Sequence, residues 1–340
     1  MSVLLVTHER YLEHQPGDGH PERPARLDAL AAAASSPGLH EALVPATPRP
    51  ATRDELLVVH DRSLVDQVEA LSMDGGGRID DDTSVSARSF EAARLAAGAG
   101  LEAIERLDRD SGDLTAAFCA VRPPGHHATP QRAMGFCLFN NVAVSASALA
   151  ARGDRVVVVD IDAHHGNGTQ DAFYDDPRVL YVSMHQYPWY PGSGASDERG
   201  TGEGFGTTLN LPMPAGATGD VYRDALDRVV IPEIEQFGPT WLLLSAGFDA
   251  HRADPLTDLG LTAGDYAAIV EELAPLVPPG RRLAFLEGGY DLGALRASAA
   301  ATLGVLAGLE PRTEAPSSGG PGSEMVDAVA AQLSRHPGAG

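Results

Sequence analysis

Acidic and histidine side chains gather where one apolar run of the sequence ends. The run that begins at Val156 leads into the motif DIDAHH, and a later apolar run ends shortly before Asp249. Because alternate side chains of an extended chain share a face, Asp160, Asp162 and His164 project to the same side. Two carboxylates and an imidazole with one open position form a ligand pattern typical of a catalytic divalent metal, usually zinc. By itself, the motif would also fit a solvated loop or a helix N-cap. The additional aspartate at the end of a second strand, Asp249, favours a metal site over these two alternatives.

Two further motifs could supply the other groups of a hydrolytic site. His126 and His127 follow another apolar run, on a loop that contains Gly125. Beside a metal, adjacent histidines could provide a general base and an electrostatic partner. Near the carboxyl end of the chain, the motif EGGY ends in Tyr290, whose hydroxyl could point into the same mouth after a tight glycine turn. If Tyr290 is considered by itself, a simple packing role is the alternative to a catalytic one.

The elements that must position these motifs are short β-branched runs alternating with alanine-rich helical patterns. Near-continuous apolar strands separated by helices indicate an α/β fold with a mostly parallel central sheet covered by helices on both faces. Ligands bind outside the carboxyl ends of such strands, where the motifs lie. The expected strands are Val3–Val6, Ala116–Val121, Val156–Asp160, Val179–Ser183, Trp241–Ser245 and Leu283–Leu286. The expected helices are Arg26–Ala33, Ser63–Leu71, Ser89–Leu107, Asn141–Arg152, Asp220–Phe237, Ala263–Leu276, Leu292–Leu306 and Glu324–Arg335.

The chain is expected to hold one domain and a short tail. Pro316–Ser323 is the only stretch that resembles a linker, and no internal repeat interrupts what precedes it. We therefore predict a single catalytic domain over residues 1–311. Residues 312–340 are predicted to form a Gly/Pro/Ser linker and a short helix that are weakly attached to it.

Composition excludes several classes of protein. The chain has 340 residues, 43% of them hydrophobic and 21% charged, which excludes a disordered or fibrous chain. It carries 25 basic and 47 acidic residues, and a net charge of −22 argues against nucleic-acid binding and would attract cationic substrates. Two cysteines are too few for a disulfide framework and suggest a cytoplasmic protein. No apolar run reaches the roughly 18 residues of a membrane span, and the opening segment does not read as a signal peptide.

Taken together, seven motifs resemble the zinc-dependent histone deacetylases and their prokaryotic relatives, the deacetylase branch of the arginase/deacetylase fold. The motifs occur in the family's order and cover most of the first 310 or so residues. HHGNG and HPERPARL are similar to those of the class II-like subgroup, which includes the histone deacetylase-like amidohydrolases. The seven motifs are HPERPARL at His20–Leu27, RPPGHHA at Arg122–Ala128, GFCLFNN at Gly135–Asn141, DIDAHHGNG at Asp160–Gly168, SMH at Ser183–His185, AGFDAH with ADPL at Ala253–Leu256, and EGGY at Glu287–Tyr290.

The resemblance implies an activity and assigns roles to residues. It implies removal of acetyl or other acyl groups from lysine side chains of proteins or peptides, with release of acetate. One catalytic zinc ion would be held by Asp162, His164 and Asp249. His127 would take a proton from the attacking water and later return one to the leaving amine, and the Tyr290 hydroxyl would help to stabilise the oxyanion.

The same resemblance assigns partners to the two histidines. His126 would be hydrogen-bonded by Asp160, and His127 by Asn167. Many family members have Asp where Asn167 stands. Because an amide cannot stabilise an imidazolium by charge, we expect His127 to stay neutral more easily than in those members.

The resemblance also implies a narrow acyl-lysine tunnel and a potassium ion. The expected substrate-binding residues are Gly135, Phe136, Tyr190, Leu256 and Gly289. The potassium ion would have a structural role and would be held by main-chain oxygens, which leave little trace in a sequence. Its expected ligands are Asp160, Asp162, His164, Ser183 and Met184.

Other residues have simpler interpretations. His185 follows an apolar run and is expected to be structural, and Cys137 is expected to serve packing. His251 stands where the arginase branch would place a carboxylate for a second metal, which favours a single metal. Asp80–Asp82 reads as a solvated run, although the family uses an aspartate on a rim loop in this region to hold the substrate backbone, so one of the three is a candidate.

Four functions are alternatives for a chain with these motifs. Leu256 is apolar where polyamine-specific members would gain from an acidic group, and His8–Arg23 has no large insertion, so acyl-lysine is favoured over acetylpolyamines. The expected partner is an acetylated lysine peptide or a small acetylamine. A non-catalytic binding module would be expected to lose one of the expected zinc ligands or Tyr290, and all of these residues are present. An arginase-like ureohydrolase is disfavoured by His251 and the paired histidines. No oligomeric state is predicted.

Overall fold

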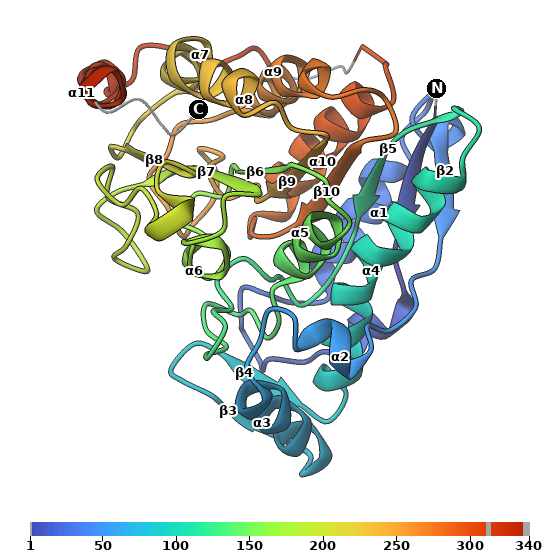
Figure 1. The fold of residues 1–340 in the computed structure, drawn as a ribbon. Helices are drawn as coiled ribbons and strands as arrows, with labels where there is room; N and C mark the ends of the chain where they lie inside the picture. Colours follow the sequence, from blue (N-terminus) through green and yellow to red (C-terminus); the bar gives the residue numbers. More distant parts are fainter. Residues whose placement is uncertain (1, 311–313, 336–340) are drawn as a thin grey trace.

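Eight parallel strands form the central sheet, so their carboxyl ends lie along one edge (Figure 1). A computed structural model describes residues 2–310 and 314–335 of the chain. The order across the sheet is β2-β1-β5-β10-β9-β6-β7-β8. The strands are β1 (Ser2–Val6), β2 (Leu43–Ala46), β5 (Leu114–Cys119), β6 (Val156–Asp160), β7 (Val179–Gln186), β8 (Thr208–Met213), β9 (Trp241–Ala246) and β10 (Arg282–Leu286).

The inner strands are apolar because both of their faces are covered. Every residue of β6, VVVVD, is buried, and so is every residue of β9, WLLLSA. Strands buried on both faces need no alternation of polar and apolar residues. The six expected strands are all present, and the α/β fold with a parallel central sheet is confirmed. The sequence analysis missed the two edge strands, β2 and β8.

Helices cover both faces of the sheet (Figure 1). Helices α4 and α5 pack against each other on one face, over β5, β10, β6 and β9, with α6 beside them. On the other face α10 lies between α1 and α9, and α7 contacts α9. The helices of these two layers are α1 (Ala25–Ala34), α4 (Ser89–Arg109), α5 (Asn141–Ala151), α6 (Asn167–Phe173), α7 (Gly219–Ala225), α8 (Ile231–Phe237), α9 (Ala263–Leu273) and α10 (Leu292–Leu306).

The helix expected over Asp220–Phe237 is interrupted. A π-helical turn over Leu226–Val230 separates α7 from α8. Pro232 lies in the first turn of α8 and has no N–H to continue the α-helical hydrogen-bond ladder. Gly238 then ends α8 in the left-handed conformation, with φ of 62°.

A smaller unit extends from the side of α4 (Figure 1). It consists of α2 (Arg53–Leu56), α3 (Arg62–Met73) and an antiparallel hairpin of β3 (Gly76–Arg78) and β4 (Ser84–Ser86). A second hydrophobic cluster, which includes Leu56, Leu64, Val65, Val68 and Val85, attaches this unit to α4. The turn of the hairpin carries Asp80–Asp82.

The tail is held more firmly than the sequence analysis expected. The predicted boundary between residues 311 and 312 lies outside the described residues. Ser317 donates two hydrogen bonds to the buried carboxylate of Asp265, one from its N–H and one from its hydroxyl. Helix α11 (Ser323–Arg335) then buries Val326 and Val329 in the main core, beside α7 and β8. The linker composition did not reveal these anchors because single polar contacts leave no pattern in a sequence.

Two expectations from composition can be compared with the structure. Cys119 and Cys137 are both buried and both unpaired. Within residues 2–310 and 314–335, none of the helices combines the length and apolar character needed to cross a membrane.

Candidate active site

The site lies at the carboxyl ends of the four central strands, which are neighbours in the order β5-β10-β9-β6. The loop after β5 carries the two adjacent histidines, and the loop after β10 carries Tyr290. The loop after β9 carries Asp249, and the end of β6 carries Asp160 with the residues that follow. Four segments far apart in the sequence therefore meet at one place because their strands are adjacent and parallel.

Asp162, His164 and Asp249 converge on one point. Each offers a ligand atom, and these atoms all lie within 4.8 Å of one another. Nδ1 of His164 lies 3.1 Å from Asp162 Oδ1 and 3.1 Å from Asp249 Oδ2. All three side chains are buried. Two carboxylates and one imidazole within this distance suit a divalent cation with a position left open for other ligands.

The electrostatics of this cluster also favour a cation. Burial raises the pKa of Asp249, and the neighbouring charge of Asp162 raises it further. Two carboxylates in a dry site repel each other unless positive charge lies between them. The donor set therefore fits zinc, and the structure brings together the three residues that the sequence analysis named as its ligands.

Backbone groups hold the two carboxylates in place. Gly288 N–H donates to Asp162 Oδ2 at 2.7 Å, and Ala163 N–H donates to Asp249 Oδ1 at 2.8 Å. A Cβ at Gly288 would collide with carboxylate oxygens of both Asp249 and Asp162, and a Cβ at Gly247 would collide with Asp162. Glycine is therefore required at these two positions so that the backbone can approach the carboxylates.

The two adjacent histidines have different partners. Nδ1 of His126 lies 3.0 Å from Asp160 Oδ2, and Asp160 also accepts a hydrogen bond from the Tyr181 hydroxyl. Nδ1 of His127 lies 2.9 Å from Asn167 Oδ1. The two imidazole centres are 4.0 Å apart. The resemblance implied both pairings, and the structure contains them.

These partners push the pKa values of the two imidazoles in opposite directions. Burial alone would lower the pKa of His126, but the charges of Asp160 and Asp162 outweigh it and raise that pKa to about 10. Burial lowers the pKa of His127, and the positive charge of His126 lowers it further. These shifts favour the protonated form of His126, which lies next to carboxylates, and the neutral form of His127.

A pocket with a volume of about 220 Å³ leads to this cluster. His127 and His164 form its inner end, and Asp82 is part of its wall. Five of the expected residues, Gly135, Phe136, Tyr190, Leu256 and Tyr290, also line it, together with Trp189. The lining is mainly aromatic and aliphatic with a few polar groups, which suits a slender apolar chain that ends in a polar reacting group.

The wall formed by Gly135 and Phe136 has an uncommon backbone. Gly135 has φ of 56°, and a Cβ there would collide with the His127 ring. Phe136 has φ of 68°, which among the described residues makes it the only non-glycine with positive φ. Its N–H donates to Thr83 Oγ1 at 3.1 Å, and Thr83 Oγ1 donates to Asp82 Oδ1 at 2.8 Å. The hairpin turn thus supports both the strained wall and the rim carboxylate of Asp82.

Tyr290 lines the pocket beside Phe136. The Phe136 ring meets it edge-on with centroids 5.8 Å apart, and the Arg26 guanidinium lies 5.1 Å from its ring centre. Burial raises the pKa of the Tyr290 hydroxyl, so it stays protonated and can act as a hydrogen-bond donor. Its backbone N–H donates to Asp254 Oδ2 at 2.6 Å.

Several expected residues lie away from the pocket. Gly289, which was expected to bind substrate, is not among the residues that line the pocket. Its carbonyl accepts a hydrogen bond from Arg26 Nε at 2.7 Å. Of the acidic run, Asp82 lines the pocket, Asp80 pairs with Arg132, and Asp81 is exposed. His185 is buried, with its two ring nitrogens next to Ser183 and Gly194, and His251 is buried 3.6 Å from Glu314.

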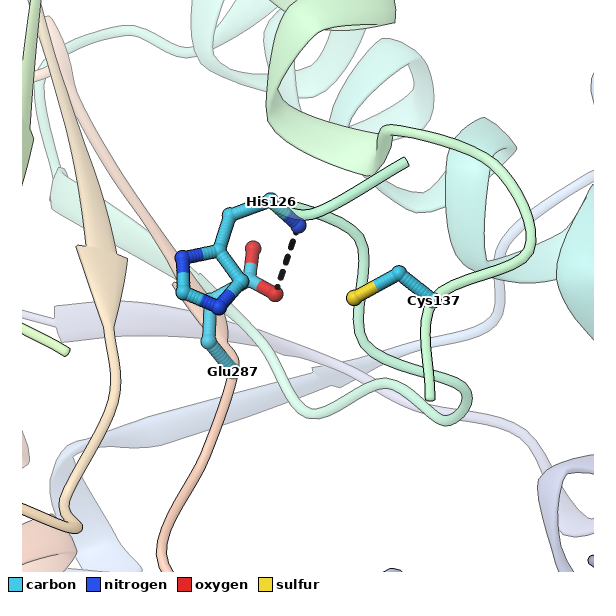
Figure 2. Close-up of side chains that lie close together, drawn as sticks. All are labelled: His126, Cys137 and Glu287. Atoms are coloured by element: carbon cyan, nitrogen blue, oxygen red, sulfur yellow. Dashed lines mark hydrogen bonds between the residues drawn. The ribbon is translucent and has the colours of Figure 1, made fainter. Parts of the chain in front are cut away.

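A second group of possible metal ligands includes His126 itself (Figure 2). His126, Cys137 and Glu287 place ligand atoms within 4.8 Å of one another. Glu287 Oε2 already accepts the N–H groups of Gly125 and His126, at 2.7 and 3.1 Å. The Cys137 thiol donates to a carbonyl, and burial raises its pKa well above the usual value. The Glu287 hydrogen bonds support the loop that carries the histidines. The buried, protonated thiol is consistent with the packing role expected for Cys137.

Three residues of the site were not singled out by the sequence analysis. Asp82 was one of three equivalent candidates until the hairpin turn placed it at the pocket. Trp189 lines the mouth, and its indole N–H donates to the Leu256 carbonyl at 3.1 Å. Asp254 lies beneath this mouth and was read only as part of the motif ADPL. An aromatic residue and a proline-flanked aspartate in loops carry no periodic signal.

Matches to known proteins extend over nearly the whole chain. Residues 20–306 match the family described as "Histone deacetylase domain". The "Probable deacetylase" of Archaeoglobus fulgidus is 39% identical over 318 residues, which cover 91% of this chain and 88% of that protein. Histone deacetylase 15 of Arabidopsis thaliana is 42% identical over 319 residues, which cover 92% of this chain and 57% of that longer protein. The crystal structure of the HDA15 HD domain is similar with a TM-score of 0.90 and 38% identity, covering 99% of this chain and 96% of that one.

Proposed function

This chain belongs to the histone deacetylase family, and from that membership we propose that it is a zinc-dependent amidohydrolase that removes acetyl groups from lysine side chains of proteins or peptides. One observation carries the proposal. The cluster of Asp162, His164 and Asp249 lies at the inner end of a narrow pocket, next to the neutral imidazole of His127 and beside Tyr290. Hydrolysis of an amide needs these groups in one place: an electrophile, a base and an oxyanion donor.

Asp162, His164 and Asp249 would hold the zinc ion. When bound, zinc makes a water molecule more acidic and polarises the amide carbonyl. The Gly288 and Ala163 N–H groups fix the two carboxylates that would hold the ion, and the buried setting would strengthen the charge interactions around it.

His127 would act as general base and then as general acid. Its Nδ1 faces the Asn167 amide oxygen and therefore carries the hydrogen, which leaves Nε2 free to accept a proton from the attacking water. As the water oxygen bonds to the carbonyl carbon, the proton passes to His127. When the carbon–nitrogen bond breaks, His127 gives a proton to the leaving nitrogen, and acetate and a free amine result. The positive charge of His126 favours the negative charge that develops nearby.

The Tyr290 hydroxyl would donate a hydrogen bond to the carbonyl oxygen as it becomes an oxyanion. Phe136 and Tyr190 would flank the aliphatic part of the acylated side chain, since both rings line the pocket. Asp82 would accept hydrogen bonds from the substrate backbone at the mouth, because its carboxylate is the acidic group of the pocket lining nearest the rim loop.

Lysine is favoured over polyamine substrates by the mouth of the pocket. Leu256 and Trp189 present apolar surface there, which gives a second ammonium group no partner on that side. Hydrolysis of acetylpolyamines is the alternative, and Asp82 together with the net charge of −22 is the observation in its favour.

Two further assignments accompany the proposal. Asp160 and Ser183 are paired in register on β6 and β7, and their main-chain oxygens, with those of Asp162, His164 and Met184, would hold a structural potassium ion. The two buried, unpaired cysteines support a cytoplasmic location, where thiols stay reduced.

The proposal is tested by loading the purified protein with one equivalent of zinc and measuring acetate release from an acetyl-lysine peptide. We expect activity that a chelator abolishes and zinc restores. The variant Asp249→Ala should lose both the metal and the activity while its circular dichroism spectrum stays close to that of the wild type. Full zinc occupancy in Asp249→Ala would refute the ligand assignment, and no acetate release by the zinc-loaded wild type would refute the function.

A further inference from the structure

Asp254 receives three backbone hydrogen bonds from two different loops. Its Oδ2 accepts the N–H of Tyr290 at 2.6 Å and the N–H of Asp291 at 3.3 Å, and its Oδ1 accepts the N–H of Leu256 at 3.0 Å. The residue is only 7% exposed, so water does not replace these contacts readily. A carboxylate that accepts several N–H groups is a strong and directional anchor.

The loop that carries Tyr290 needs such an anchor. Tyr290 follows two glycines, and Gly289 has φ of 112°, a conformation that only glycine adopts readily. A flexible glycine pair does not by itself fix the direction of the next side chain. The Arg26 guanidinium holds the Gly289 carbonyl on one side, and the Asp254 carboxylate holds the Tyr290 N–H on the other.

The same carboxylate connects Tyr290 to the pocket mouth. Leu256 lines the mouth, and its carbonyl accepts the indole N–H of Trp189 from the loop after β7. Further along the Leu256 loop, the Thr257 hydroxyl donates to the main-chain carbonyl of Asp249 at 2.6 Å. Asp254 therefore lies where the mouth, the metal cluster and the tyrosine loop meet.

We propose that Asp254 is a positioning residue that fixes the Tyr290 hydroxyl over the reacting carbonyl by clamping the tyrosine loop to the mouth loop. This inference rests on the proposed function and adds to it a residue that does not touch substrate. Replacement by Asn isolates the effect, because an amide offers one accepting atom where the carboxylate offers two. Whichever way the amide is turned, its NH₂ group faces a backbone N–H.

The experiment is a double-mutant cycle between Asp254→Asn and Tyr290→Phe, with zinc-loaded protein and an acetyl-lysine peptide. We expect Asp254→Asn to lower kcat by about 10- to 100-fold with a small change in KM, and to have little further effect when Tyr290 is already Phe. Asp258→Asn is the matched control. Asp258 is exposed on the same loop and contacts Gln186 rather than the tyrosine loop.

A second substrate separates positioning from general damage. A trifluoroacetyl-lysine peptide has a more electrophilic carbonyl and depends less on an oxyanion donor. In each variant, turnover of the trifluoroacetyl peptide should therefore fall less than turnover of the acetyl peptide. The reduction in this loss should be similar in Asp254→Asn and in Tyr290→Phe. Zinc content and melting temperature of Asp254→Asn should match those of Asp258→Asn.

The outcomes are distinct. Independent, multiplicative losses in the double mutant, an equal loss on both substrates, or loss of zinc from Asp254→Asn would each overturn the positioning role. An inactive wild type on both peptides would instead overturn the proposed function. Wild-type kcat in Asp254→Asn would show that the clamp is not needed and would also overturn the inference.

Discussion

His127 and Asn167 are joined through an amide oxygen, with Nδ1 of the imidazole 2.9 Å from Oδ1 of Asn167. The neighbouring His126 has a carboxylate, Asp160, in the equivalent place. The Asn167 oxygen adds no negative charge beside His127, and burial together with the positive charge of His126 lowers the pKa of that imidazole. In the proposed mechanism Nε2 of His127 is therefore the proton acceptor. The two adjacent imidazoles therefore differ in the charge of their hydrogen-bond partners, a carboxylate for His126 and an amide for His127.

Asn167→Asp tests this difference. A carboxylate next to His127 favours its protonated form and should raise its pKa by about one unit or more. Because the base must be neutral, activity is present above that pKa and lost below it. The acid limb of kcat/KM should therefore move to higher pH by a similar amount. An unchanged acid limb in the zinc-loaded variant would mean that another group titrates there.

Tyr290→Phe removes the hydroxyl that is proposed as the oxyanion donor and little else. We expect kcat to fall by roughly 10²–10³, the usual cost of one such donor, while the melting temperature changes little. Tyr174→Phe, at the end of α6, removes a hydroxyl away from the pocket and serves as the control. Near wild-type turnover in Tyr290→Phe would assign carbonyl polarisation to another group.

Leu256→Glu should move substrate choice toward acetylpolyamines. A carboxylate at the mouth offers the distal ammonium of acetylspermidine a partner about 4 Å away, worth on the order of 4 kcal/mol before desolvation. A fraction of this energy changes preference by about tenfold, since roughly 1.4 kcal/mol is a factor of ten. The ratio of kcat/KM for acetylspermidine to that for the peptide should rise by that factor at high salt. A constant ratio would exclude Leu256 as a determinant.

Glu22 gives the stability of the fold a specific acid dependence. It is fully buried and pairs with Arg122 and Arg26. Burial alone would raise the pKa of Glu22, but the charge and hydrogen bonds of Arg122 outweigh it and lower that pKa to about 2. With an unfolded value near 4.5, the shift corresponds to about 3 kcal/mol of stability, present above pH 4.5 and lost as pH falls toward 2.

Glu22→Gln should therefore lower the free energy of unfolding by about 3 kcal/mol at pH 7, and more if the buried arginines stay uncompensated. The difference in the free energy of unfolding between the variant and the wild type should become smaller as pH falls from 5 to about 2.5. Urea unfolding across this range measures it. A gap that does not depend on pH would show that Glu22 contributes through packing and not through its charge.

The central strands could be read from the sequence because they are buried on both faces. β6 and β9 are continuous apolar runs, and the polar residues that follow them meet in the structure, as the parallel strands predicted. The edge strands were missed for a physical reason. β2 (LVPA) and β8 (TLNLPM) each contain a proline, which edge positions tolerate and inner strands do not. β8 also contains an asparagine, a residue that is depleted in strands.

Long-range polar contacts were beyond the reach of a single sequence. Glu22 and Arg122 are 100 residues apart and bond directly, yet neither has a local pattern that names the other. Asp254 and Tyr290, 36 residues apart, are a second case. The resemblance to a family supplied the pairing of His126 with Asp160 and of His127 with Asn167, whereas spacing alone gave only a shared face for the DxDxH side chains.

The central claim is tested most directly by comparing two substrates on the zinc-loaded wild-type protein at high salt. High salt screens the net charge of −22, so that this charge no longer attracts either substrate. The measured quantity is kcat/KM for acetate release from an acetyl-lysine peptide and from acetylspermidine. The apolar mouth at Leu256 and Trp189 predicts a preference of about tenfold or more for the peptide. A preference of about tenfold for acetylspermidine would contradict the lysine assignment, and no acetate from either substrate would contradict the enzymatic one.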